Sequence, residues 1–234
     1  RNVAGGEELR DTLCRESVTY TVRRNNIEVA ASHRFCNAAP VTIAIYYGMQ
    51  SMFEGETHVL TPGGAYTDWT EAAKASTFTK QEYPLFRRYV EKNRQGYQST
   101  WLLPDGLGDH ALLDGQDDIF IYAPYGKSYH KLIGNKRMEN GDKTCWRGVY
   151  TWFETPVADD ADLLCYEGSA GGHTAVFIDC KRACKRTLAL PGYLDLRHFG
   201  TAEQNSGIRI SAAGRNKLKI KADAPGSCVL LLRE

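Results

Sequence analysis

Short segments of alternating apolar and polar residues run through almost the whole chain and limit what it can fold into. Residues 17–24 (SVTYTVRR) place every second side chain on one apolar face, and the segment IEVAAS resumes the pattern after two asparagines, which predicts a β-hairpin. The later segments are similarly short and mostly end at Gly, Pro, Asn or Asp. This spacing predicts an all-β protein, a large antiparallel β-sandwich, and not alternating β and α units.

One segment has a different pattern. In residues 82–93 (EYPLFRRYVEKN) the apolar residues Leu85, Phe86, Tyr89 and Val90 follow a spacing that suits a helix, and Pro84 would be tolerated in a first turn. A two-turn helix and a bent edge strand fit this segment equally well.

Aromatic residues divide the chain unevenly. All four tryptophans and most tyrosines lie between residues 40 and 155, whereas the later segments are short and aliphatic. The polar, proline-bearing residues 155–162 (TPVADDAD) mark a boundary. We therefore expect an aromatic-rich β-sandwich portion at 1–155 and a smaller β portion at 156–234, as two sandwiches or as one continuous domain.

Charge and motifs remove several classes of function. The net charge of +1 gives no basic excess for nucleic acid, and no apolar run reaches the length of a membrane-spanning helix. Phosphate-binding, dinucleotide-binding and serine-hydrolase motifs do not occur, and ADDAD (158–162) lacks the glycine and glutamate of a calcium loop. We expect no cofactor, no metal and no membrane insertion.

Seven cysteines cannot all pair within the chain, because the number is odd. Their spacing does not match a zinc site. We expect them to be mainly small buried residues, with one or two disulfides at most.

Aromatic side chains on strands and turns are typical of sugar-binding surfaces, where they stack on the C–H faces of pyranose rings. The candidates for stacking are Trp69, Tyr97, Trp101, Tyr122, Tyr125, Tyr129 and Trp152. Asp68 and His58, near Trp69 around the turn Pro62-Gly63-Gly64, are candidate polar partners. The alternative is that these aromatic rings fill the core of a sandwich of this size.

Three pairs of residues could supply general acid–base chemistry on a glycan: His110 with Asp109, His130 with Tyr129, and His58 with Asp68. None of the spacings specifies a mechanism. Each histidine could equally be a hydrogen-bonded structural residue.

Several segments together resemble secreted β-sandwich proteins that gut bacteria use on polysaccharides, in particular those with the galactose-mutarotase-like supersandwich. The segments are IYYGMQSMF, HVLTPGGAYTDW, YQSTWLLPDGLGDHALL and WRGVYTWF, with the aliphatic C-terminal strands. The resemblance implies a polysaccharide or oligosaccharide ligand and a periplasmic, extracellular or cell-surface location in a bacterium.

Three functions remain open from the sequence. The first is a carbohydrate-interacting protein or the non-catalytic part of a larger glycan-degrading protein. The second is a glycan-active enzyme of the mutarotase, lyase or glycoside hydrolase kind. The third is a structural or protein-interaction module of the cell surface.

Overall fold

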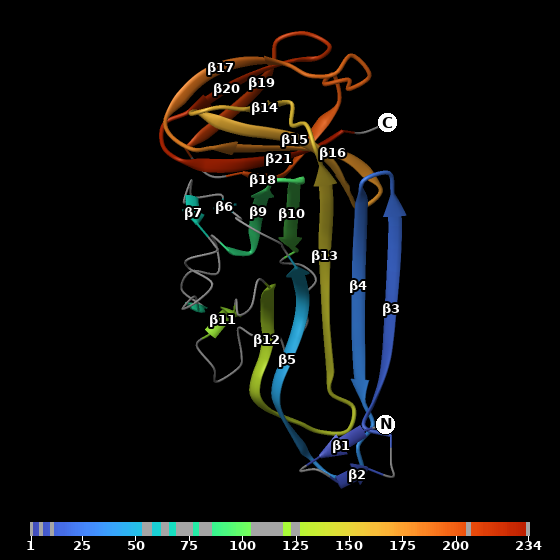
Figure 1. Ribbon diagram of the computed structural model, residues 1–234. Helices are drawn as coiled ribbons and strands as arrows, with labels where there is room; N and C mark the ends of the chain where they lie inside the picture. The colour runs from blue at the N-terminus through green and yellow to red at the C-terminus, as the bar shows by residue number, and fades with distance from the viewer. Residues whose placement is uncertain are drawn as a thin grey trace.

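The computed structural model of the protein describes residues 2–4, 7–9, 12–52, 58–61, 66–68, 77–79, 86–103, 119–122, 127–204 and 207–232 (Figure 1). The elements in these ranges are β-strands, and their pairings are antiparallel. The prediction of an all-β antiparallel protein is confirmed.

The strands fall into two groups along the chain. The first group consists of β1 (Asn2–Ala4), β2 (Glu7–Leu9), β3 (Cys14–Arg23), β4 (Asn26–Phe35), β5 (Val41–Met52), β6 (His58–Leu60), β7 (Tyr66–Asp68), β8 (Thr77–Thr79), β9 (Arg88–Asn93), β10 (Gly96–Leu102), β11 (Ile119–Tyr122), β12 (Lys127–Met138) and β13 (Lys143–Phe153). The second group consists of β14 (Ala158–Asp159), β15 (Leu163–Ala170), β16 (His173–Cys180), β17 (Cys184–Ala189), β18 (Phe199–Gln204), β19 (Ile208–Ala212), β20 (Lys217–Ala222) and β21 (Gly226–Leu232).

The first group forms a sandwich, drawn in blue to yellow-green in the lower part of Figure 1. A seven-stranded sheet in the order β3-β4-β13-β10-β9-β6-β7 packs against a four-stranded sheet in the order β5-β12-β11-β8. The core between the sheets includes Val29 and Trp146 from one sheet and Met49 and Leu132 from the other. The predicted hairpin at residues 17–32 is confirmed as β3–β4.

The second group forms a smaller sandwich, drawn in orange to red at the top of Figure 1. Its sheets have the orders β14-β15-β16-β21-β18 and β17-β20-β19. β20 shows the alternation expected for a sheet with one buried face, because Leu218, Ile220 and Ala222 are buried and the lysines between them are exposed.

An apolar cluster joins the two sandwiches. Phe153, Tyr166 and Phe177 stack in sequence with ring centroids 4.5 and 4.8 Å apart, and Trp101 meets the edge of Phe177. None of the described sheets combines strands from before residue 154 with strands from after residue 157. The division at residues 155 and 156 remains a prediction about domains, because this shared cluster crosses it.

Within the segment at 82–93, Arg88–Asn93 forms strand β9, which lies between β10 and β6, inside the sheet and not at its edge. Residues 82–85 lie outside the described residues. Tyr89 faces the first core, and Val90 belongs to the cluster that joins the sandwiches. Because both faces of the sheet are covered here, neighbouring residues are both apolar and the expected alternation is lost.

The seven cysteines are only partly buried, because Cys14, Cys36, Cys145 and Cys184 are half-exposed. Cys165, Cys180 and Cys228 are buried, and no disulfide joins any of the seven cysteines, all of which lie in the described residues.

Candidate functional site

The structure places only some of the residues that the sequence singled out. Trp69, Asp109, His110 and Tyr125 lie outside the described residues, so their proposed roles stay predictions.

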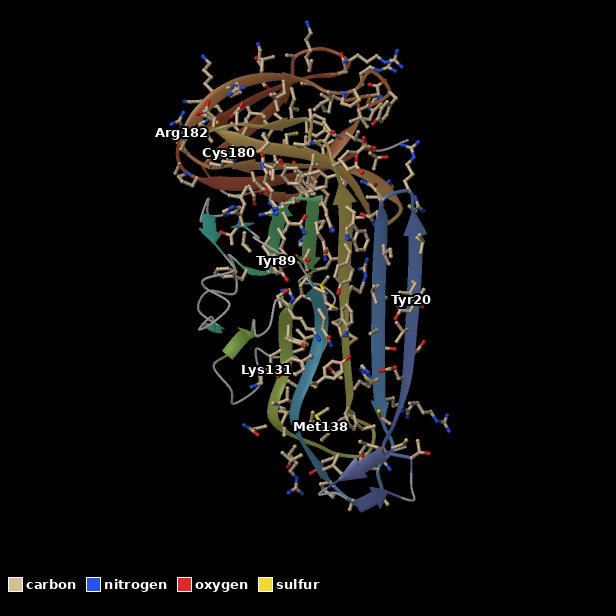
Figure 2. The ribbon with its side chains drawn as sticks, viewed as in Figure 1. Tyr20, Tyr89, Lys131, Met138, Cys180 and Arg182 are labelled. Carbon is tan, nitrogen blue, oxygen red and sulfur yellow. The ribbon has the colours of Figure 1, made fainter. Side chains whose placement is uncertain are left out.

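His130 and Trp101 are core residues. His130 is entirely buried, its ring stacks on Tyr89 (labelled in Figure 2) at 5.5 Å, and its Nε2 lies 3.2 Å from the carbonyl oxygen of Phe86. Burial lowers the pKa of His130 to about 4, so the ring is neutral at neutral pH. Trp101 is 4% exposed and packs on Phe177. Neither side chain is open to a ligand, and we retain neither as a catalytic or stacking residue.

Tyr129 and His58 have partly exposed side chains at separate places. Tyr129 lies on β12, and its ring contacts Tyr47 with centroids 4.8 Å apart. His58 begins β6, and the register of the β6–β7 hairpin places it opposite Asp68. The backbones of His58 and Asp68 are therefore neighbours. The turn predicted at Pro62-Gly63-Gly64 lies outside the described residues.

A hollow of about 550 Å³ lies beside the β9–β10 hairpin, where β5 and β13 end. The register aligns Glu91 on β9, Gln98 on β10 and Trp152 on β13 across three adjacent strands. Directly opposite residues of antiparallel strands share one face of the sheet, so these side chains line the hollow together. The full lining is Met52, Glu91, Asn93, Gln95, Gly96, Tyr97, Gln98, Trp152, Phe153 and Glu154.

Trp152 presents the largest exposed ring in this hollow. It is 40% exposed and stacks on Tyr150 with ring centroids 5.9 Å apart and an interplanar angle of 17°. The Tyr150 hydroxyl accepts a hydrogen bond from the Gln50 N–H and donates one to the Gln50 carbonyl, each at 3.0 Å. Tyr150 is thus fixed to the opposite sheet and holds the Trp152 ring. Met52, also on β5, adds an apolar side chain that is 69% exposed.

Glu91 is a buried residue in the lining of this hollow. The residue is 2% exposed, and its two carboxylate oxygens make no hydrogen bond to the rest of the described structure. Burial raises the pKa of Glu91 from 4.5 to about 8, and the nearby Ser128 hydroxyl opposes this only in part. Ser128 is itself hydrogen-bonded to the Tyr89 hydroxyl at 2.6 Å. Glu91 is therefore mainly a neutral carboxylic acid at neutral pH.

A second, smaller hollow of about 260 Å³ lies on the other face of the same strands, and His58 is part of its lining. Asp159 also lines this hollow. Its carboxylate accepts hydrogen bonds from Lys181 at 2.6 Å, from Lys92 at 2.8 Å and from the Tyr97 hydroxyl at 2.6 Å. Partial burial alone would raise the pKa of Asp159, but these donors outweigh it and lower the pKa to about 2. The charges here satisfy one another, which indicates a structural role at the junction of the sandwiches.

Sequence reasoning did not identify Glu91, Gln98 or Asn93. A signal existed for Glu91, since it is the only carboxylate in RYVEKN (88–93) and directly follows the apolar residues Tyr89 and Val90. Nothing in the sequence pattern separates Gln98 and Asn93 from other polar surface residues, because only strand pairing brings them to Trp152.

No protein-family model, curated protein or solved structure matches the chain. Within the described ranges, no helix is long and apolar enough to cross a membrane, and no group of three or more His, Cys, Asp or Glu side chains is arranged to hold a metal ion. The function is therefore inferred from the residues and their geometry.

Proposed function

We propose that the protein binds an oligosaccharide, or a segment of a polysaccharide, in the hollow beside the β9–β10 hairpin. The observation that carries this proposal is the exposed ring of Trp152, which is held by Tyr150 and surrounded by amide side chains. A pyranose ring presents apolar C–H faces and hydroxyl groups at its edges, so its recognition needs an aromatic platform beside hydrogen-bonding groups.

The polar groups around Trp152 suit neutral sugar hydroxyls. Asn93, Gln95 and Gln98 each offer a carbonyl acceptor and an NH₂ donor, and a hydroxyl group can both donate and accept. The protonated Glu91 would add no full negative charge on the inner side. The hollow is within the usual size range of small-ligand sites, roughly 300–1,000 Å³, which would admit a few sugar units.

A glycan array probed with the purified protein tests the proposal, followed by calorimetric titration of any sugar that binds. Trp152→Ala should abolish measurable binding because the platform is removed. Tyr193→Ala is the matched control, since Tyr193 is 66% exposed but lies on the second sandwich. If no sugar binds, or if both variants bind as the unsubstituted protein does, the proposal fails, and a structural or protein-interaction role becomes the better one.

A glycan-active enzyme is the second candidate, and Glu91 is the specific observation in its favour. A carboxyl group that remains protonated at neutral pH can serve as a general acid, and Glu154 lines the same hollow as a second carboxylate. The Glu91 oxygens are buried, however, so contact with a substrate would require the hollow to open. This requirement makes binding the first proposal and catalysis the second.

Product formation separates the two candidates. Any glycan that binds would be incubated with the protein and followed for new reducing ends or unsaturated products. In an enzyme, Glu91→Gln should abolish turnover and leave binding intact, because the amide keeps the shape but cannot supply the proton. In a binding protein, no product forms at any protein concentration.

The proposed ligand also bears on location. Because the resemblance is to secreted proteins that act on polysaccharides, we extend the proposal to a periplasmic, extracellular or cell-surface setting. This setting falls with the proposal if no glycan binds.

A further inference from the structure

Strand β3 is the outermost strand of the seven-stranded sheet, and among the described strands it pairs only with β4 (Figure 1). Its ten residues are exposed or half-exposed along their whole length. A long, exposed edge strand offers a row of backbone N–H and C=O groups on which another strand can form hydrogen bonds.

One face of β3 is apolar although it is open to solvent. Val18, Tyr20 (labelled in Figure 2) and Val22 are 36%, 66% and 67% exposed. The register places Val18 opposite Ala31 and Tyr20 opposite Val29, and both β4 residues are buried in the first core. The apolar face of the sheet therefore continues beyond the part that the second sheet covers.

The hydrogen-bond pattern fixes which residues of β3 have their backbone groups at the free edge. The Cys36 N–H donates to the Leu13 carbonyl, and the β3–β4 register extends this pairing to Arg23 opposite Asn26. Residues that exchange hydrogen bonds recur at every second position of an antiparallel pair. The odd-numbered residues of β3 therefore bond to β4, and Val18, Tyr20 and Val22 direct their N–H and C=O groups outward.

We propose that β3 pairs antiparallel with β3 of a second copy of this chain, with Tyr20 opposite Tyr20. Only registers that join even-numbered residues to even-numbered residues bring the outward backbone groups of both copies together. In the Tyr20-centred register, Val18 lies opposite Val22 of the second copy, and Glu16 lies next to Arg24 of the second copy, the first residue of the turn that follows β3.

Charge complementarity selects this register over its neighbours. A shift by two residues in one direction would place Arg15 opposite Arg23 of the second copy, and directly opposed like charges destabilise a strand pair. A shift by two residues in the other direction would move Arg24 of the second copy away from Glu16 and next to Val18. Glu16 and Arg24 are accessible, with side chains 57% and 82% exposed. Nη1 of Arg24 lies 4.0 Å from Oε1 of Glu167, an exposed contact that solvent screens. The existing contact of Glu16 with His33 Nε2, at 2.7 Å, leaves its other oxygen available for a second donor.

The pairing is self-complementary and closes on itself. Its two-fold axis passes through the Tyr20 pair, perpendicular to the sheet, so both copies use the same surface and the assembly ends at a dimer. The apolar faces formed by Val18, Tyr20 and Val22 would then be contiguous across the joined sheets. No residue of β3 lines the hollow at Trp152, so the pairing does not require the proposed ligand.

Sedimentation velocity over a range of protein concentrations tests the proposal. The unsubstituted chain should form a dimer that dissociates on dilution. Glu16→Arg or Arg24→Glu alone opposes like charges twice per dimer and should raise the dissociation constant by about tenfold or more. The double variant Glu16→Arg/Arg24→Glu restores opposite charges and should restore the dimer.

The exposed pair Arg209 and Asp223, on the second sandwich, provides the matched control. Exchanging its charges should leave the sedimentation of the protein unchanged. Thermal unfolding of each variant would confirm that the fold is intact. A monomer at every concentration, a dimer unaffected by the single substitutions, or a double variant that stays as weak as the single variants would overturn the proposed pairing.

Discussion

Arg88 on β9 and Asp179 on β16 form a two-pronged ion pair across the junction between the two sandwiches. Nη1 of Arg88 donates to Oδ2 of Asp179 at 2.9 Å, and Nη2 donates to Oδ1. The two side chains are 1% and 3% exposed. The Tyr166 hydroxyl, which is hydrogen-bonded to Ser99 at 2.7 Å, lies 3.3 Å from the same Nη1.

Removing one partner of this pair should be costly. Asp179→Ala leaves the Arg88 charge buried without its carboxylate, and we expect a loss of about 3–5 kcal/mol in the free energy of unfolding. Urea denaturation of the variant and of the unsubstituted protein measures this loss. Replacing both residues, as Arg88→Met/Asp179→Leu, should recover most of the loss, because no uncompensated charge then remains buried.

The exposed pair of Arg209 with Asp223 gives the comparison. The side chains are 61% and 51% exposed, and Asp223→Ala should cost under about 1 kcal/mol because solvent screens the pair. Equal losses for Asp179→Ala and Asp223→Ala would show that the buried pair does not anchor the junction.

The strand pattern of the sequence was sufficient to predict the fold class, since alternation and turn residues act locally. It did not separate helix from strand at residues 82–93. Tyr89 and Val90 are buried on opposite faces of a sheet that is covered on both sides, and this coverage is a property of the tertiary structure. The alternation at residues 17–24 predicted a strand correctly, but it could not show that the apolar face is exposed.

Only part of the candidate site could be predicted. The exposed ring of Trp152 was among the aromatic candidates, whereas the equally plausible Trp101 is buried against Phe177. A tryptophan on a strand carries no sequence mark of which face it occupies or what covers it. Glu91 and Gln98 lie far from Trp152 in the sequence, and the three residues come together through the pairing of β9, β10 and β13.

Burial of Glu91 should make the stability of the protein fall as the pH rises. The unfolded chain loses this proton near pH 4.5, whereas the folded protein holds it up to about pH 8, so the folded state binds more protons between these values. His130 makes the stability rise with pH between its folded pKa of about 4 and its ordinary value of 6.5, because in this range the unfolded chain binds more protons. The interval from pH 6.5 to 8 therefore isolates Glu91.

Over that interval, the free energy of unfolding of the unsubstituted protein, measured with denaturant, should fall by about 2 kcal/mol. Glu91→Gln, which has the same shape and no titrating group, should remove this fall. The hypothesis of a buried neutral Glu91 does not survive if the two proteins show the same pH dependence.

Gly148 on β13 should not tolerate a side chain. A Cβ at this position would lie 2.1 Å from the sulfur of Met49 and 2.9 Å from its Cγ, and Met49 is fully buried, so the whole side chain would have to shift within the core. Gly148→Ala should therefore lower the free energy of unfolding by about 1–3 kcal/mol. Gly192→Ala is the matched control, because no atom lies within 4 Å of its Cβ position, and it should change stability by less than about 0.5 kcal/mol. A Gly148→Ala protein as stable as the Gly192→Ala protein would contradict the tight packing of β13 against β5.

Asp159 should contribute stability that is lost in acid. Its folded pKa of about 2 lies below its ordinary value of 3.8, so the unfolded chain binds the proton first as the pH falls. The stabilisation is complete above pH 3.8 and disappears as the pH falls through 2. Allowing for solvent screening, we expect Asp159→Asn to cost about 1 kcal/mol at pH 7 and nothing near pH 2. Equal destabilisation at both pH values, measured by urea unfolding, would mean that Asp159 acts through packing and not through its charge contacts with Lys92 and Lys181.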